Sequence, residues 1–199
     1  MILLDPRVGD KVPGQKQSHA LGNAFEALGI DYSLVHLDFA DCCFFGNGPQ
    51  GDVQVGIELK TVPDLINSMH SGRLAEQIEG MMERYSHSWL IVEGFYRARR
   101  RDGLAETPRG GGWRPLSLGK RPIFWRDLES FLTSIEVETA MVGRPVHVRR
   151  SRTGNETARL IGLLYEWWQK EYSSHRSLKV VRKPEPASLG FVRENPQTR

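Results

Sequence analysis

The sequence predicts an α/β domain built around one mixed β-sheet, and three observations carry that prediction. Short apolar runs bounded by Gly, Pro and Asp alternate with segments in which apolar residues recur at helical spacing. Two of the apolar runs, residues 32–45 and 53–60, are separated only by the turn-forming cluster GNGPQGD, so they are expected to form an antiparallel hairpin. At 199 residues, the chain suits a single well-buried domain rather than two.

The first half of the chain is expected to fold in the order β-α-β-β-α. MILLD reads as a short buried strand, and residues 14–30 carry apolar residues at helical spacing. The hairpin follows. Thr61 can then cap a helix that has Asp64 in its first turn, a capping-box arrangement. The apolar stripe after this cap predicts one continuous helix that ends near Tyr85.

The second half is expected to add the order β-α-β-α. SWLIVEG is a compact apolar strand, and residues 95–122 after it are rich in Arg, Gly and Pro without clear periodicity, which predicts a long loop. Residues 123–140 return to helical spacing, PVHVRRS predicts a strand, and NETARLIGLLYEWWQKEY predicts an amphipathic helix. The domain is therefore expected to span residues 1–172, followed by a basic, Pro-containing tail over residues 173–199.

Charge is divided unevenly between the two halves. Residues 1–96 carry 6 Lys and Arg against 13 Asp and Glu, whereas residues 97–199 carry 21 against 11. An acidic region that gathers cations beside a basic region that grips a polyanion is typical of proteins that act on nucleic acid.

Composition also argues against a membrane or secreted protein. No apolar run approaches the ~18 residues that a membrane helix requires, and the N-terminus lacks the basic region of a signal peptide. Cys42 and Cys43 are adjacent in an apolar segment, a spacing that favours reduced, buried thiols over a structural disulfide. A cytoplasmic protein without a membrane partner is expected.

Glu58 and Lys60 are the first candidates for chemistry. Alternate residues of a strand share a face, so these two charges point the same way, and Asp41 on the neighbouring strand lies at a height that reaches them. Two carboxylates suit Mg²⁺ or Mn²⁺ and leave positions open for water and a phosphate oxygen, while a lysine can stabilise developing charge. A surface salt bridge is the competing interpretation. Asp52 also fits by spacing but lies in a Gly-rich turn, where Asp favours turn geometry.

The spacing D-x(16)-E-L-K fits the PD-(D/E)xK nuclease pattern, and the flanking residues make the match more specific. The stretches LDFADCCFF and VGIELKTVPDLINSMHSGRLAEQIEGMMERYSHSWLIVEG resemble the ERCC4-type nuclease domain of the XPF family of structure-specific endonucleases. LLDPRVGD resembles that family's opening motif, and VHVRRSRTGNETARLIGLLYEWW is similar to its closing strand and helix. The resemblance covers roughly residues 1–170. It implies a restriction-endonuclease-like fold, with a mixed central sheet flanked by helices.

The resemblance assigns roles to individual residues. Asp41 and Glu58 become metal ligands, Lys60 becomes the catalytic lysine, and Asp5 becomes an additional catalytic and metal-binding carboxylate. Residues placed near the site or the DNA are Arg7, Asp64, Arg73 and Gln77. Asp64 also has a structural explanation as a helix cap, and Arg73 and Gln77 could instead belong to a solvated helix face. Candidates for phosphate contacts from the arginine run are Arg97, Arg99, Arg100 and Arg101.

Three positions depart from the family's motifs. Ala40 stands where the family has the glycine of GD, Leu59 where it has the arginine of ERK, and Val8 where the opening motif has glutamate. Val8 weakens the case for a second metal position, for which Asp10 is close enough in sequence to compensate. The residues after Ser173 are too few for a helix-hairpin-helix domain, so a small stand-alone nuclease, phage-like or bacterial, is expected.

These observations predict a Mg²⁺- or Mn²⁺-dependent DNA endonuclease that cuts branched or flapped DNA in repair, recombination or phage DNA processing. It is expected in the cytoplasm, associated with the nucleoid or in a phage-infected host cell. One alternative uses the same site to resolve Holliday junctions or to degrade DNA ends. Another is a catalytically silent DNA-binding or assembly protein. A homodimer is left open.

Overall fold

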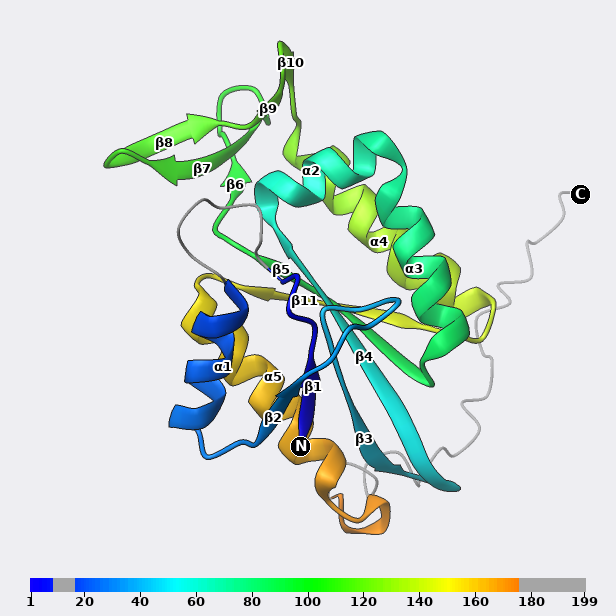
Figure 1. Cartoon of the computed structure of the whole chain (residues 1–199). Helices are drawn as coiled ribbons and strands as arrows, with labels where there is room; N and C mark the ends of the chain where they lie inside the picture. Colours follow the sequence, from blue (N-terminus) through cyan, green and yellow to red (C-terminus); the bar gives the residue numbers. More distant parts are fainter. Residues whose placement is uncertain (9–16, 176–199) are drawn as a thin grey trace, which may run out of the picture.

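A six-stranded mixed sheet forms the centre of the structure, a computed structural model that describes residues 1–8 and 17–175 (Figure 1). Its strands, in spatial order, are β11 (Val146–Ser151), β5 (His87–Glu93), β4 (Gly51–Thr61), β3 (Cys42–Gly48), β1 (Ile2–Leu4) and β2 (Tyr32–Leu34). The helices are α1 (Gln17–Ala27), α2 (Val62–Ser71), α3 (Arg73–Arg84), α4 (Trp125–Met141) and α5 (Gly154–Gln169). This arrangement confirms the predicted α/β class.

Strand β3 is antiparallel to both of its neighbours, β4 and β1, and the other neighbouring strands of the sheet pair in parallel. β11, β5 and β4 run parallel, whereas β3 is antiparallel to β4, as expected for the predicted hairpin. The hairpin register pairs Cys42 with Ile57, so residue 41 lies at the end of the ladder, beside Glu58. Parallel strands need long connections, and these contain α1 between β1 and β2, α2 and α3 between β4 and β5, and α4 between β5 and β11.

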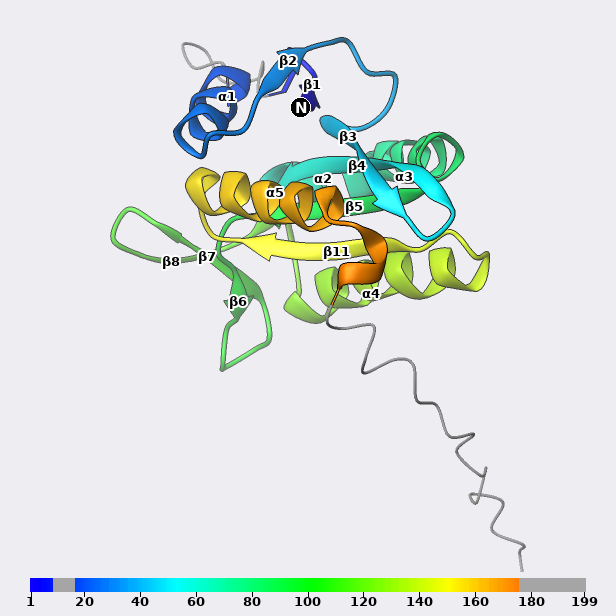
Figure 2. The ribbon, with the colours of Figure 1, turned by 90° about the horizontal axis from the view of Figure 1, so that it is seen from below.

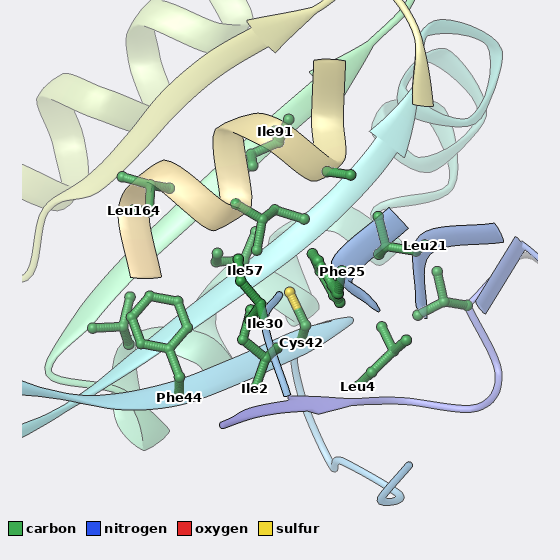
Figure 3. Close-up of a cluster of buried hydrophobic side chains, with 14 of the residues drawn as sticks. Ile2, Leu4, Leu21, Phe25, Ile30, Cys42, Phe44, Ile57, Ile91 and Leu164 are labelled. Atoms are coloured by element: carbon green, nitrogen blue, oxygen red, sulfur yellow. The ribbon is translucent and has the colours of Figure 1, made fainter. Parts of the chain in front are cut away.

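Helices cover the sheet in two layers (Figure 2). α1 and α5 pack on one face, over the cluster drawn in Figure 3, which includes Phe25, Phe44 and Ile57. α2, α3 and α4 cover the other face, where Leu65 and Leu128 belong to a second apolar cluster with strands β5 and β11. Side chains alternate between faces along a strand, so β4 contributes to both layers. No helix within the described ranges is long and apolar enough to cross a membrane.

Two predicted elements are each interrupted in the structure. The helix expected to run to Tyr85 is two helices, because Gly72 adopts a left-handed conformation (φ +77°) that ends α2. The strand expected over residues 32–45 is likewise split into β2 and β3. Residues 35–41 leave the sheet between them, with Ala40 at a positive φ of +72°. In both cases apolar residues continue across the break, so the pattern did not reveal it.

The predicted long loop at 95–122 is wrong, because this segment contains short strands. They are β6 (Arg97–Ala98), β7 (Ala105–Arg109), β8 (Gly112–Pro115), β9 (Ser117–Leu118) and β10 (Arg121–Pro122). Gly110 and Gly111 form the two-residue turn of the β7–β8 hairpin, and both have positive φ, as such a turn requires. The hairpin projects from the body of the molecule (Figure 1).

The first residues of the predicted tail, 173–175, are described by the structure. Residues 172–174 form a short 3₁₀ helix, and His175 is buried with its ring stacked on Trp167 at 3.8 Å. The remainder of the predicted tail, residues 176–199, lies outside the described residues.

Gly56 marks a close approach between β4 and the end of α3. A Cβ atom at this position would lie 2.3 Å from a ring carbon of Tyr85. We expect Gly56→Ala to lower the free energy of unfolding by about 2 kcal/mol, because the buried ring must move. Urea denaturation measures the change. Gly112→Ala, on the open side of the β7–β8 hairpin with nothing within 4 Å of its Cβ, is the control and should shift stability by less than about 0.5 kcal/mol.

Candidate active site

Strand β4 carries Glu58 and Lys60 on the face covered by α2 and α3. Both side chains are buried, with exposed fractions of 1% and 6%, and Lys60 Nζ donates to Glu58 Oε1 in an ion pair. The alternate residues Ile57 and Leu59 belong to the apolar cluster on the opposite face. The pair is therefore not the exposed surface salt bridge of the competing interpretation. It is a charged pair enclosed at the end of a core strand.

Asp41 is fixed beside this pair by backbone hydrogen bonds. Its own amide donates to the carbonyl of Ile57 at 2.9 Å, and the amide of Leu59 donates to Asp41 Oδ2 at 2.6 Å. The carboxylate is thus held against the backbone of the residue that follows Glu58. This contact places the predicted pair of carboxylates together.

The backbone conformation at Ala40 accounts for the glycine that the family's motif has at this position. Its backbone lies in the left-handed region, at φ +72°, where glycine is the residue without a steric penalty. The family's glycine at this position therefore has a conformational reason. Here alanine adopts the same kind of turn, and its methyl group is buried against Met81 and Tyr85.

The surroundings of Asp41 disfavour its charged form. Burial, followed by the negative charge of Glu58, raises the pKa of Asp41 to about 7, against the opposing effect of Lys60. When Asp41 is ionised, two adjacent carboxylates face a single lysine, and a bound cation would offset the excess negative charge.

Gln77 of α3 reaches down to the same carboxylate. Its Nε2 donates to Glu58 Oε1 at 2.7 Å, whereas its Oε1 is buried without a hydrogen-bond partner among the described residues. A buried acceptor without a donor indicates a place for water or a ligand. Arg73, one helical turn earlier, is exposed and donates to Ser68 Oγ at 3.1 Å, so the two predicted helix residues have different surroundings.

Asp64 is accounted for by the helix cap. Its amide donates to Thr61 Oγ1 at 3.3 Å, and the Thr61 hydroxyl donates to Asp64 Oδ2 at 2.8 Å. This is the capping box that the sequence predicts. Its predicted DNA contact stays a prediction.

Asp5 lies next to the site but has both oxygens occupied. Its backbone amide donates to the carbonyl of Asp41 at 2.9 Å. Arg7 donates to Asp5 through its backbone amide, Nε and Nη2, at 2.7, 2.9 and 2.7 Å, and the Leu37 amide donates at 2.8 Å. Burial would raise the pKa of Asp5, but these hydrogen bonds outweigh it and lower the pKa to about 2. As a metal ligand, Asp5 stays a prediction that requires Arg7 to release it.

The residues present fit a divalent cation with open coordination positions. Among the described residues, no hydrogen bond reaches Asp41 Oδ1 or Glu58 Oε2, so each carboxylate keeps one oxygen for a ligand role. Over the same residues no group of three or more His, Cys, Asp or Glu side chains is close enough to hold a metal. Two carboxylates alone leave several positions for water and phosphate oxygens. Asp10 lies outside the described residues.

The arginine run predicted to contact phosphate is partly engaged within the protein. Arg97 Nε donates to the buried Glu106 at 2.7 Å, and Arg99 is paired with Asp102 at 2.6 Å. Arg101 lies 3.4 Å from the same aspartate, and Arg100 is exposed. The run belongs to the projecting β-structure and not to the surroundings of Glu58. Sequence reasoning did not single out Arg109 or Arg114 of this projecting structure, although Arg109 directly precedes three consecutive glycines, the signal of a hairpin tip.

Solved structures share this fold. The protein titled XPF from Aeropyrum pernix matches with a TM-score of 0.56 at 20% identity, over 91% of this chain and 68% of that chain. The structure titled XPF from Aeropyrum pernix, complex with DNA, matches with a TM-score of 0.54 at 22% identity, over 83% and 63%. This chain therefore spans about two thirds of their length. At these identities the likeness shows the fold alone. A search of curated proteins gives no match.

The fold is that of a restriction-endonuclease-like nuclease domain, with Asp41, Glu58 and Lys60 at the end of its central hairpin. The chain belongs to the ERCC4 domain family, whose family model matches residues 5–164. This match confirms the resemblance drawn from the sequence.

The hydrogen bonds that Asp5 accepts from Arg7 and Leu37 are expected to make a pH-dependent contribution to the free energy of unfolding. We expect Asp5→Asn to lower the free energy of unfolding at pH 7 by at most about 2 kcal/mol, since Arg7 is 60% exposed and water screens its charge. Because the folded-state pKa is lowered from its usual 3.8 to about 2, this contribution is present above about pH 4 and is lost as the pH falls toward 2.

Urea denaturation between pH 7 and pH 2.5 checks this expectation, with the exposed Asp38→Asn as control. The difference in the free energy of unfolding between wild type and Asp5→Asn should become smaller as the pH falls through the acid range. A gap that stays constant would show that the carboxylate's charge is not the stabilising feature.

Proposed function

We propose that this protein is a Mg²⁺- or Mn²⁺-dependent endonuclease that hydrolyses phosphodiester bonds in DNA. One observation carries the proposal: two adjacent carboxylates, Asp41 and Glu58, each keep a free oxygen beside a buried lysine. A carboxylate pair and a lysine with open coordination positions is a device for phosphodiester hydrolysis. A purely structural ion pair would not need the third charge that Asp41 adds.

Each side chain has a distinct task in this proposal. A divalent cation held by Asp41 and Glu58 would supply the acid that lowers the pKa of a water molecule and offsets charge on the phosphate. Lys60 uses one N–H on Glu58 and has two more donors for the attacking oxygen or the phosphate. Gln77 fixes the direction of Glu58 through Nε2, while its Oε1 can accept a hydrogen bond from the attacking water. No covalent intermediate is required.

The substrate proposed is branched or flapped DNA, in repair, recombination or phage DNA processing. The positive charge of residues 97–199 supports a polyanionic substrate, and the DNA complex of the Aeropyrum pernix protein shows that a protein of this fold binds DNA. The location proposed is the cytoplasm, in association with the nucleoid or in a phage-infected host cell. A homodimer is kept as part of the proposal.

Removing any of the three central groups tests the mechanism. We expect Asp41→Asn, Glu58→Gln and Lys60→Met each to slow cleavage of splayed, flapped and four-way-junction DNA at least about 100-fold with Mg²⁺ or Mn²⁺. Gel-based cleavage assays under single-turnover conditions measure the rate. Asp52→Asn, at the competing turn position, should keep the wild-type rate.

The rates on the different DNA substrates also distinguish the proposed endonuclease from the two alternative functions. Preference for the four-way junction or for linear ends would favour a resolvase or an end-degrading nuclease using the same site. Wild-type protein that binds these DNAs but cuts none of them would contradict the proposal and favour a silent binding protein.

Substitution of Gln77 is expected to slow cleavage less than substitution of Asp41, Glu58 or Lys60, and to change the metal dependence. We expect Gln77→Leu to slow cleavage about tenfold and to raise the Mn²⁺ concentration for half-maximal rate, because Glu58 loses the donor that orients it. Metal titrations of the cleavage rate measure both quantities. Glu76→Ala, the exposed neighbour on α3, is the matched control. An unchanged metal dependence in Gln77→Leu would remove Gln77 from the site.

A further inference from the structure

The projecting segment 95–122, here called the arm, carries a large surplus of positive charge. It holds 8 Lys and Arg against two acids, Asp102 and Glu106. Both acids are already paired, Asp102 with Arg99 and Arg101, and Glu106 with Arg97. Exposed cations for which the described residues show no ion pair are Arg100, Arg109, Arg114, Lys120 and Arg121. The surplus therefore faces solvent.

The β7–β8 hairpin sorts its side chains onto two faces. The register pairs Thr107 with Arg114 and Arg109 with Gly112, so both arginines lie on one face. The tip between them is glycine, and a Cβ built at Gly110, Gly111 or Gly112 would meet nothing within 4 Å. Without side chains at the tip, the backbone amides can approach a ligand closely.

The opposite face of the hairpin is packed. Trp113 lies under the guanidinium of Arg97 at 3.7 Å and in edge contact with Phe95 at 5.5 Å. Arg97 is in turn held by Glu106. On the arginine face, the Thr107 hydroxyl donates to the carbonyl of Phe95 at 2.8 Å. These contacts fix the direction of the hairpin, so the arginine face is presented by a supported element.

The base of the arm adjoins the end of β4 that carries the site. β5 ends at Glu93, which is paired with Thr61, the residue after Lys60. Gly94 then packs against Val62 at the start of α2. The arm begins at Phe95, and Figure 1 shows it projecting from this same end of the sheet.

We propose that the arm binds the phosphodiester backbone of DNA on one side of the cleavage position, with Arg109 and Arg114 as its principal contacts. The inference rests on the proposed function for its choice of DNA as ligand. It replaces Arg97 and Arg99 as phosphate contacts, because those two side chains hold the arm together. The backbone bound can belong to duplex or to an unpaired strand.

Binding in the absence of divalent metal tests this inference without cleavage. Fluorescence anisotropy of the full chain with labelled duplex, flapped duplex and single strand, from 50 to 300 mM salt, gives affinity and its salt dependence. We expect the double variant Arg109→Ala, Arg114→Ala to bind about tenfold more weakly near physiological salt. Its slope of log K against log salt should fall by about 2, the number of phosphate contacts removed.

Two further variants make the test specific. Arg109→Lys with Arg114→Lys keeps the charge and should bind within about twofold of wild type. Arg144→Ala with Arg159→Ala removes the same charge from exposed positions outside the arm and should leave the slope unchanged. If the alanine variant loses affinity for duplex, for single strand or for both, the result supports the proposal and identifies which kind of DNA supplies the bound backbone.

The proposal is overturned if the alanine variant matches wild type in affinity and slope on all three DNAs, or if the lysine variant loses as much as the alanine variant. Because no cleavage is measured, an inactive metal site would leave this result unaffected. Failure of the arm and failure of the nuclease proposal are therefore distinguishable.

Discussion

The position of every group in the candidate site depends on the register of the β3–β4 hairpin. Cys42 faces Ile57, and two hydrogen bonds continue this register to Asp41, one from its amide to the Ile57 carbonyl and one from the Leu59 amide to its carboxylate. A slip of one residue would turn Glu58 and Lys60 toward the apolar cluster on the other face and bring Ile57 and Leu59 into their place. The register is thus enforced by burial on both faces at once.

The enclosed charges are a local exception to the rules that govern the rest of the core. Removing two charges from water opposes folding, so a buried ion pair is weak evidence for stability. Glu58 and Lys60 share their surroundings with Gln77 Oε1, which has no hydrogen-bond partner in the described part of the chain, and with the strained backbone at Ala40. Departures from good packing chemistry that gather at one place indicate a functional site.

Features set by neighbours in sequence were predictable, and features set by partners further away were not. The shared face of Glu58 and Lys60 follows from the two-residue period of a strand, and the Thr61–Asp64 cap from four consecutive residues. The helix break at Gly72 was hidden by an apolar stripe that continues across it. The arm's strands of two to five residues are too short to show periodicity. The engagement of Asp5 by Leu37 depends on a loop 32 residues away.

The connectivity of the site has a consequence for how the chain can change. Asp41, Glu58, Lys60 and Gln77 all lie within one uninterrupted stretch, residues 41–77, formed by a hairpin and the helices that follow it. Contacts of such short sequence separation close with a small loss of chain entropy, so this stretch can form early in folding. The arm, residues 95–122, follows this stretch in the chain. Insertions or deletions in the arm can therefore change the proposed DNA-binding surface while the four groups of the candidate site keep their geometry, so the two proposed roles can vary independently.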